Sequence, residues 1–249
     1  MKRGFYTIMS AQFFSSLADN ALFVTAVELL KSDGAAEWQR AALVPMFALF
    51  YVVLAPFVGA FADSRPKGEV MLMSNTIKVV GCLMMLFGVH PLLAYAIVGL
   101  GAAAYSPAKY GILTELLPAS QLVKANGWIE GLTIASIILG VLLGGQLVGP
   151  NLSAFLLSFD LPFFTTGVDT SAEAAICLLI PLYALAAWFN KRIPYTGAAL
   201  IPMRLDPEKT MVRNLLALVP DFWHCNQRLW HDKLGQISLA TTTLFWGVS

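Results

Sequence analysis

The sequence is poor in charged residues, has few cysteines and contains no cluster of basic side chains. Only 12% of its 249 residues are Asp, Glu, Lys or Arg, against about 25% in a typical soluble domain, whereas 57% are hydrophobic. Together with a mean hydropathy of +0.69, this composition excludes a water-soluble globule and indicates several membrane-spanning segments. The net charge of +1 and the dispersed Lys and Arg residues give no sign of nucleic-acid binding.

Metal-binding and redox patterns are also missing. The three cysteines, Cys82, Cys177 and Cys225, stand far apart and in no pairing or metal-ligand spacing, so we expect small buried apolar side chains. His224 and His231 flank Cys225 at a spacing that matches no established zinc site. We therefore expect neither a metal nor another cofactor.

Six stretches are long and apolar enough to cross a bilayer, which requires about 20 residues. They are predicted at 5–30, 41–62, 70–89, 92–117, 123–148 and 172–189. Basic residues near their ends fall mostly on one side, which the positive-inside rule assigns to the cytoplasm. Those on this side are Lys2, Arg3, Arg65, Lys67, Lys124, Lys191 and Arg192. Both ends of the bundle, including the N-terminus, are thus predicted to be cytoplasmic.

The predicted organisation is an all-α membrane protein in three parts. Residues 1–190 form the six-helix transmembrane bundle, 191–235 a cytoplasmic amphipathic linker, and 236–249 the start of a truncated seventh helix. Helix starts are predicted in the linker at Asp206-Pro207-Glu208 and Pro220-Asp221. We expect the second linker helix to lie in the inner membrane interface, because its large apolar residues share one face. These are Phe222, Trp223, Leu229 and Trp230.

Four of the predicted spans carry an ionisable residue at some depth. A charged side chain at the centre of a spanning helix costs roughly 2.5–3.5 kcal/mol, so such residues must face one another or a wet cavity. They are Asp19, Lys78, Lys109 and Glu130; Glu115 lies nearer a span end. In a structural interpretation, Asp19 pairs with Lys109 and Lys78 with Glu130. In a functional one, the four outline a polar path.

Asp19 and Lys109 have neighbours that favour the functional interpretation. Asn20 follows Asp19, and Ser106, Pro107 and Gly111 surround Lys109. Such polar or helix-weakening residues are not needed by a purely structural pair, and Pro107 permits a kink. For Lys78 and Glu130, charge is the only feature that suggests a function, so the structural pairing is the better interpretation for these two.

The loop between the second and third spans contains a possible conformational latch. Gly59-x3-Asp63 is followed by Arg65 and Lys67, so a carboxylate at a helix end meets two cations in a tight turn. Asp63 can bind the N-terminal dipole of a neighbouring helix or one of the cations, and so hold two helices in one state. The alternative is a simple positive-inside loop.

These features resemble the N-terminal half of a major facilitator superfamily transporter. The loop is similar to that superfamily's signature, which usually runs Gly-x3-Asp-Arg-x-Gly-Arg. This chain has Ser64 where arginine is usual and Pro66 where glycine is, with Arg65 and Lys67 supplying the charge. The resemblance therefore supports Asp63 as part of a latch, but this chain lacks the arginine that usually follows it.

Five runs resemble, more specifically, the bacterial lysophospholipid transporter family and the same domain fused to acyltransferase and acyl-ACP synthetase modules. They are Ala18-Asp-Asn-Ala-Leu22, Ala55-Pro-Phe-Val-Gly59, Gly101-Ala-Ala-Ala-Tyr-Ser-Pro-Ala-Lys-Tyr-Gly-Ile-Leu-Thr-Glu-Leu116, Leu122-Val-Lys-Ala-Asn-Gly127 and Leu244-Phe-Trp-Gly247. The resemblance implies a multi-pass transporter of the bacterial cytoplasmic (inner) membrane, not an enzyme. It would move lysophospholipids, chiefly lysophosphatidylethanolamine, from the outer to the inner leaflet for reacylation by an acyltransferase/acyl-ACP synthetase partner.

The charges suit this substrate. We expect Lys109 to contact the phosphate, Asp19 the ammonium, and Asn20 and Tyr105 to donate hydrogen bonds. Two other functions stay open. A proton-coupled antiporter of small amphipaths would use Asp19 as proton carrier, but the run 140–145 lacks the proline of the usual antiporter motif. A membrane anchor for a lipid acyltransferase would need no buried charges.

Overall fold

The computed structural model describes residues 3–158, 168, 170–202 and 210–248, and among these it contains helices and connecting segments but no strands. The chain divides into two compact units, Met1–Ile201 and Pro202–Ser249. The predicted helix start at Asp206-Pro207-Glu208 lies outside the described residues. So do residues 159–167 and 169, which lie in the segment between the fifth and sixth predicted spans.

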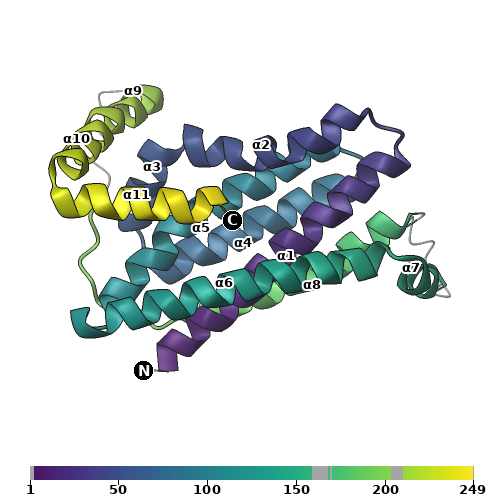
Figure 1. Ribbon diagram of the computed structural model, residues 1–249, viewed down its shortest axis with the longest axis horizontal. Helices are drawn as coiled ribbons and strands as arrows, with labels where there is room; N and C mark the ends of the chain where they lie inside the picture. The colour runs from purple at the N-terminus through teal and green to yellow at the C-terminus, as the bar shows by residue number, and fades with distance from the viewer. Residues whose placement is uncertain (1–2, 159–167, 169, 203–209, 249) are drawn as a thin grey trace. The chain divides into compact units, whose positions relative to one another are not determined.

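The first unit is a bundle of long helices that run side by side (Figure 1). Five of them are long and apolar enough to cross a membrane, and the pair α2 and α3 makes a sixth span if it is counted as one. α1 packs against α6 and α8, and α4 packs against α5 and α8. The helices are α1 (Arg3–Ser32), α2 (Glu37–Val53), α3 (Ala55–Asp63), α4 (Lys67–Leu86), α5 (Pro91–Leu116), α6 (Ala119–Val148), α7 (Pro150–Leu157) and α8 (Ser171–Lys191).

The second predicted span is broken rather than continuous. α2 and α3 are bent by 61° at Leu54. Pro56 lies in the first turn of α3, has no N–H to donate to the Val52 carbonyl, and its ring clashes with that carbonyl in a continuous helix. Pro107, in contrast, lies within α5 without ending it.

Small residues allow several helices of the bundle to pack backbone against backbone. A Cβ atom added at Gly140 or Gly144 of α6 would lie 2.6 Å from the Leu17 carbonyl oxygen or 2.7 Å from that of Ala21, both on α1. At Gly99 of α5 it would lie 2.2 Å from the Phe47 carbonyl oxygen of α2. Gly127, Gly131 and Gly145 have open space instead. Gly99, Gly140 and Gly144 therefore allow neighbouring helices to pack closely, as small residues do in membranes.

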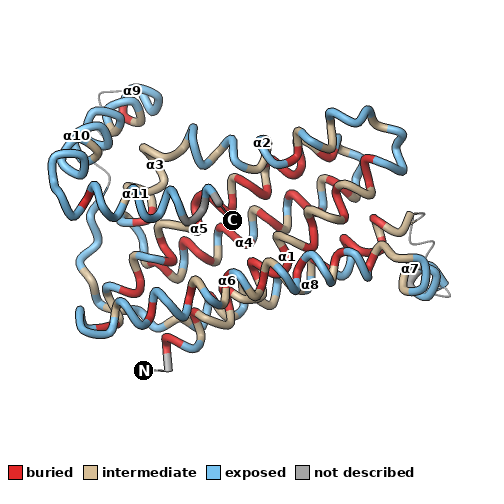
Figure 2. The backbone as a smooth tube through the Cα atoms, viewed as in Figure 1, coloured by how far each residue is buried: buried red, intermediate tan, exposed pale blue. Residues whose placement is uncertain are grey.

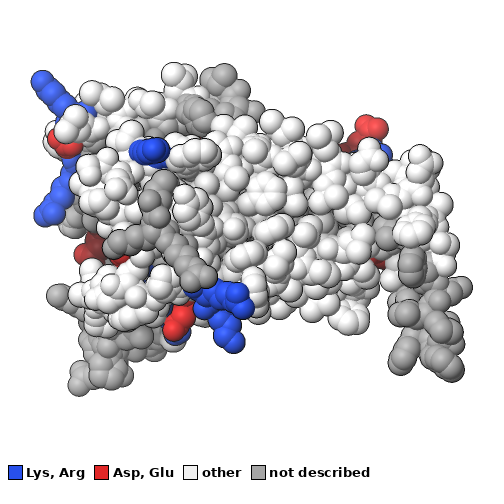
Figure 3. All heavy atoms as spheres, turned by 90° about the horizontal axis from the view of Figure 1, so that it is seen from below, with Lys and Arg blue, Asp and Glu red and all other residues white. Residues whose placement is uncertain are grey.

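The surface of the first unit suits a membrane. Exposed residues lie along the outward faces of the helices and buried ones face the interior (Figure 2). On the face shown in Figure 3, Lys, Arg, Asp and Glu gather towards the two ends and leave a band without charged side chains between them.

Cys82 is buried as expected, but Cys177 of α8 is exposed. An apolar side chain can face lipid as well as the protein interior.

The second unit consists of α9 (Met211–Leu216), α10 (Leu218–His231) and α11 (Lys233–Val248). α10 contains the predicted second linker helix but begins two residues before Pro220. Pro220 still lies in the first turn, where a missing N–H leaves no helical hydrogen bond unmade. Cys225, on this helix, is exposed rather than buried.

Candidate functional site

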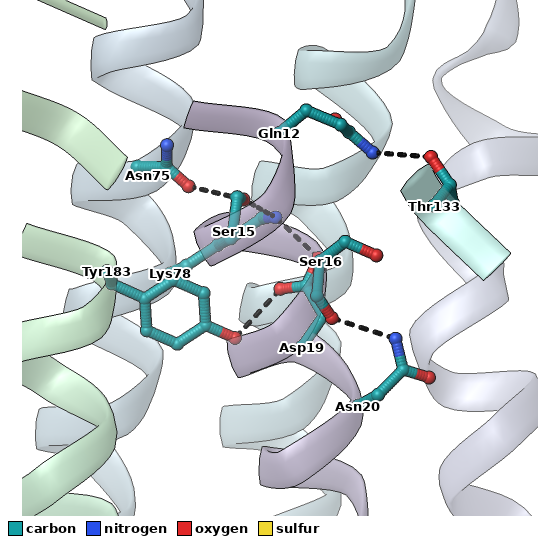
Figure 4. A network of polar contacts seen from close by, with 9 residues as sticks. All are labelled: Gln12, Ser15, Ser16, Asp19, Asn20, Asn75, Lys78, Thr133 and Tyr183. Atoms are coloured by element: carbon teal, nitrogen blue, oxygen red, sulfur yellow. Dashed lines mark hydrogen bonds and ion pairs between the residues drawn. The ribbon is translucent and has the colours of Figure 1, made fainter. Parts of the chain in front are cut away.

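A buried polar network centred on Asp19 of α1 lies within the bundle (Figure 4). Asp19 Oδ2 accepts a hydrogen bond from Lys78 Nζ of α4 at 2.7 Å, and Oδ1 accepts one from the Tyr183 hydroxyl of α8 at 2.8 Å. The Lys78 residue is 1% exposed, and the Asp19 side chain 18%. Both carboxylate oxygens are thus held by side chains from two other helices.

The Lys78 ammonium is surrounded by further groups that stabilise a cation. It donates a hydrogen bond to Ser15 Oγ at 2.9 Å, and Ser15 donates in turn to Asn75 Oδ1 at 2.7 Å. The ring centroids of Tyr105 and Tyr183 lie 5.3 and 5.7 Å from its Nζ. A carboxylate, a hydroxyl and two aromatic faces together offset the cost of burying this charge.

The predicted pairing of the buried charges is therefore wrong. Asp19 pairs with Lys78 rather than with Lys109, and Lys78 does not pair with Glu130. The depth of each residue along its helix follows from sequence position, but rotation about the helix axis does not. Lys78 reaches Asp19 because the long, flexible lysine side chain bridges from α4 to α1.

Lys109 of α5 is a buried cation in a different environment. Its residue is 7% exposed, and its Nζ lies 4.3 Å from the centroid of the Tyr110 ring. The Tyr110 hydroxyl donates a hydrogen bond to Glu130 Oε1 of α6 at 2.6 Å. Among the described residues, no carboxylate oxygen lies within 4.0 Å of Lys109 Nζ. This cation is therefore available to bind an anion.

The other predicted binding residues lie near the Asp19 network but contribute differently. The Asn20 side chain donates to the Ser16 carbonyl of its own helix at 2.8 Å. The Tyr105 hydroxyl is buried and has no hydrogen-bond partner among the described residues, although its ring faces Lys78. The structure thus brings Asp19 and Tyr105 to one cation, Lys78. Asn20 and Lys109 do not contact that cation.

Several members of the network were not predicted. Ser15 and Asp19 are four residues apart and so share one helix face, a spacing that was visible in the sequence. Tyr183 is a tyrosine in the apolar middle part of its helix, which is also a usable signal. Gln12 donates a hydrogen bond to Thr133 Oγ1 at 3.0 Å and links α1 to α6. No charge marked these residues, so reasoning from charge overlooked them.

In the predicted latch, Asp63 pairs with Lys67 rather than with Arg65. The Lys67 ammonium also donates to the Ala62 carbonyl at 2.9 Å. Lys67 is 7% exposed, and a Cβ added at Gly111 of α5 would lie 3.1 Å from its Cε. The Lys67 side chain therefore joins the end of α3 to the last turns of α5. The Arg65 guanidinium instead lies 5.7 Å from the Phe61 ring centroid, and Gly59 has open space around it.

Glu115 takes part in a contact with the segment that follows α8. We call residues 192–201 the strap. Glu115 Oε2 accepts a hydrogen bond from the Thr196 hydroxyl, and the Ile201 N–H donates to the Asp63 carbonyl at 3.0 Å. The strap thus ties the end of α5 to the end of α3. No group of three or more His, Cys, Asp or Glu residues suited to a metal ion occurs in the described part of the chain.

Comparisons with known proteins agree with this architecture. Residues 8–247 match the family model of the Major Facilitator Superfamily. The protein named "Lysophospholipid transporter LplT" from Yersinia enterocolitica serotype O:8 / biotype 1B is 40% identical over 247 residues, covering 99% of this chain and 54% of that protein. The protein of the same name from Yersinia pestis (strain Pestoides F) gives the same values. The chain therefore spans about half the length of the curated relatives it matches.

A solved structure shows the same fold. It is a bacterial homolog of the human lysosomal transporter Spinster, in an inward-facing and unoccupied conformation. The TM-score is 0.62, and the match covers 85% of this chain and 47% of that one, at 19% sequence identity.

Proposed function

The chain belongs to the Major Facilitator Superfamily, a family of multi-pass membrane transporters, and from this premise we propose that it takes part in moving lysophospholipids across the bacterial cytoplasmic membrane. The substrate class is supported by the names of relatives that share 40% identity over almost the whole chain. We place the N-terminus in the cytoplasm on the positive-inside rule. Under this proposal the protein transports its substrate without making or breaking a bond.

The observation that carries this proposal is the state of Lys109. It is a buried ammonium with an aromatic ring beside it and, among the described residues, no carboxylate within 4.0 Å. A lysophospholipid presents a phosphate, and a charge-assisted hydrogen bond from Lys109 to that phosphate would compensate both charges. Tyr105 lies one helical turn away on α5, and its buried hydroxyl, which has no hydrogen-bond partner within the described part of the chain, would donate a second hydrogen bond.

The ammonium of lysophosphatidylethanolamine would bind at Asp19. Lys78 and Tyr183 each use one lone pair of the Asp19 oxygens, and the side chain is 18% exposed, so the substrate ammonium can bind beside them or take the place of Lys78. Replacement of the Lys78 ammonium keeps Asp19 neutralised, while Ser15 and the two tyrosine rings remain beside Lys78. The Asn20 amide would turn from the Ser16 carbonyl to the head group. Glu130 would act indirectly, because it accepts a hydrogen bond from the hydroxyl of Tyr110 and so holds the ring that lies beside Lys109.

Transport from the outer to the inner leaflet by alternating access, followed by reacylation by an acyltransferase/acyl-ACP synthetase, completes the proposal. Proton-coupled antiport through Asp19 has less support, because the run 140–145 lacks the proline of the usual antiporter motif. A simple membrane anchor for an acyltransferase would gain nothing from the Asp19 network.

The test is uptake of labelled lysophosphatidylethanolamine into spheroplasts that lack their own lysophospholipid transporter. Lys109→Gln is expected to lower the uptake rate about tenfold or more, since a hydrogen bond to a charged group contributes about 1.5–3 kcal/mol. Lys124→Gln removes an exposed lysine from α6 and serves as the matched control. If both variants transport at the wild-type rate while present in equal amounts, Lys109 does not bind the phosphate.

A further inference from the structure

A cleft of about 810 Å³ lies at the end of the first unit where α4 begins and α5 and α8 end. Its walls are the first turns of α4, the end of α5, the last residues of α8 and the strap. No residue of the Asp19 network and neither Lys109 nor Tyr105 lines it. It is therefore separate from the site proposed for transport.

Two cations of this cleft are not neutralised by the protein. Lys67 is paired with Asp63, but Arg65 and Lys191 have no carboxylate oxygen within 4.0 Å among the described residues. Both are exposed. Of the carboxylates that line the cleft, Glu115 accepts the Thr196 hydroxyl and Glu69 is exposed. The Thr196 hydroxyl offsets no charge, so two cations and two carboxylates line the cleft besides the Lys67–Asp63 pair. Arg65 and Lys191 can still each bind a phosphate, because neither is held by a carboxylate of the described residues.

Apolar side chains line the same cleft next to this rim. Leu72 and Met73 lie about one helical turn further along α4 than Glu69, and Met73 is 38% exposed. Ile112 of α5 adds to the apolar lining. The cleft therefore changes from charged to apolar in the direction in which α4 enters the membrane. A small soluble anion would leave this apolar surface uncovered, whereas the acyl chain of an amphiphile would cover it.

The level of the cleft agrees with an amphiphile. Lys67 begins α4 and Lys191 ends α8, and both helices are long and apolar enough to span the bilayer. Basic residues at the ends of spanning helices lie at the level of the lipid head groups. The cations of the cleft are consequently placed beside the phosphates of one leaflet, where lipid is always present.

We propose that this cleft binds a membrane phospholipid, with its phosphate at Arg65 and Lys191 and the first part of an acyl chain against Leu72 and Met73. This lipid is a resident of the leaflet and not the transported molecule. Because the strap forms one wall, a bound lipid also packs against the segment that holds the Asp63 carbonyl.

The experiment is native mass spectrometry of the purified, delipidated protein, to which phosphatidylglycerol or phosphatidylethanolamine is added in detergent. We expect one lipid equivalent of higher affinity than the remaining ones. Lys191→Gln should weaken it about tenfold by removing one phosphate contact, and Ala198→Trp should remove it by filling the cleft. Lys124→Gln, an exposed lysine on α6 outside the cleft, should leave it unchanged.

Two further arms separate a resident phospholipid from a free phosphate ion and from the transported molecule. Inorganic phosphate at millimolar concentration should not displace the lipid; if it does so as well as a second phospholipid, the cleft is a phosphate site and the proposal is overturned. Wild-type lipid binding in both Lys191→Gln and Ala198→Trp would overturn it too. Lys109→Gln should keep this lipid even when transport is lost, so the outcome does not depend on the proposed function.

Discussion

Asp19 of α1 and Lys78 of α4 form the ion pair at the centre of the bundle, with Oδ2 and Nζ 2.7 Å apart. Lys78 is almost fully buried, and the Tyr183 hydroxyl holds the other oxygen of Asp19. Lys78 has almost no access to solvent and Asp19 has little, so each charge depends on the other for its burial. The pair therefore joins α1, α4 and α8 and also holds the carboxylate that the substrate would use.

Removal of Lys78 should destabilise the bundle strongly. Lys78→Met leaves the Asp19 carboxylate without its cation, and we expect the free energy of unfolding to fall by about 3–5 kcal/mol. Lys31→Met, which breaks the exposed Lys31–Glu28 pair of α1, should cost less than about 1 kcal/mol. Denaturant unfolding in detergent measures both. The double variant Asp19→Asn/Lys78→Met should recover much of the loss, and equal losses in the two lysine variants would contradict a structural role for the pair.

The close contact of Gly140 on α6 with α1 leads to a second prediction about stability. A methyl group at Gly140 would lie 2.6 Å from the Leu17 carbonyl oxygen and 2.8 Å from Asn20 Cβ, so the helices must move apart. Gly140→Ala should lower the free energy of unfolding by about 1–3 kcal/mol. Gly145→Ala is the control on the same helix, where nothing lies within 4 Å. It should be neutral or slightly stabilising, because alanine is the better helix former.

The charged residues of the bundle show how far the sequence could predict the site. The lengths of the apolar stretches located the spans, and the sequence shows which positions within them carry a charge. Both kinds of information depend only on position along a helix. Which charge meets which depends on rotation about each helix axis, and the low charge of the chain leaves few polar residues to define it. The pairing of Asp19 was therefore wrong, although the residues themselves were found.

Two backbone features were missed for other reasons. The bend at Leu54 follows from Pro56, but Pro45 and Pro107 lie within helices that continue, so a proline alone does not predict a break. The strap has no periodic pattern. Its position depends on single contacts, from Thr196 to Glu115 and from Ile201 to Asp63, that pair residues far apart in the sequence.

The latch provides a prediction that distinguishes the two cations of its loop. Lys67 is buried, bound to Asp63 and to the Ala62 carbonyl, whereas Arg65 is exposed. Lys67→Gln should therefore lower the melting temperature by several degrees, as the loss of about 1–3 kcal/mol in a helical bundle does. Arg65→Gln should leave it nearly unchanged. Thermal unfolding of the two variants in the same detergent measures the difference, and a reversed order would identify Arg65 as the partner of Asp63.

The role proposed for Asp19 can be separated from its structural role by the choice of substrate. Lysophosphatidylethanolamine carries an ammonium and lysophosphatidylglycerol does not, while both carry the phosphate expected at Lys109. Asp19→Asn should therefore lower uptake of the first about tenfold relative to the second, since one hydrogen-bonded charge contact contributes about 1.5–3 kcal/mol.

The measured quantity is the ratio of the two uptake rates within one variant. Any loss of folded protein caused by the unpaired Lys78 affects both substrates equally and cancels in this ratio. Lys109→Gln should lower both rates and leave their ratio near the wild-type value. If Asp19→Asn also leaves the ratio unchanged, Asp19 holds Lys78 and Tyr183 in place without touching the head group, and the ammonium must bind elsewhere.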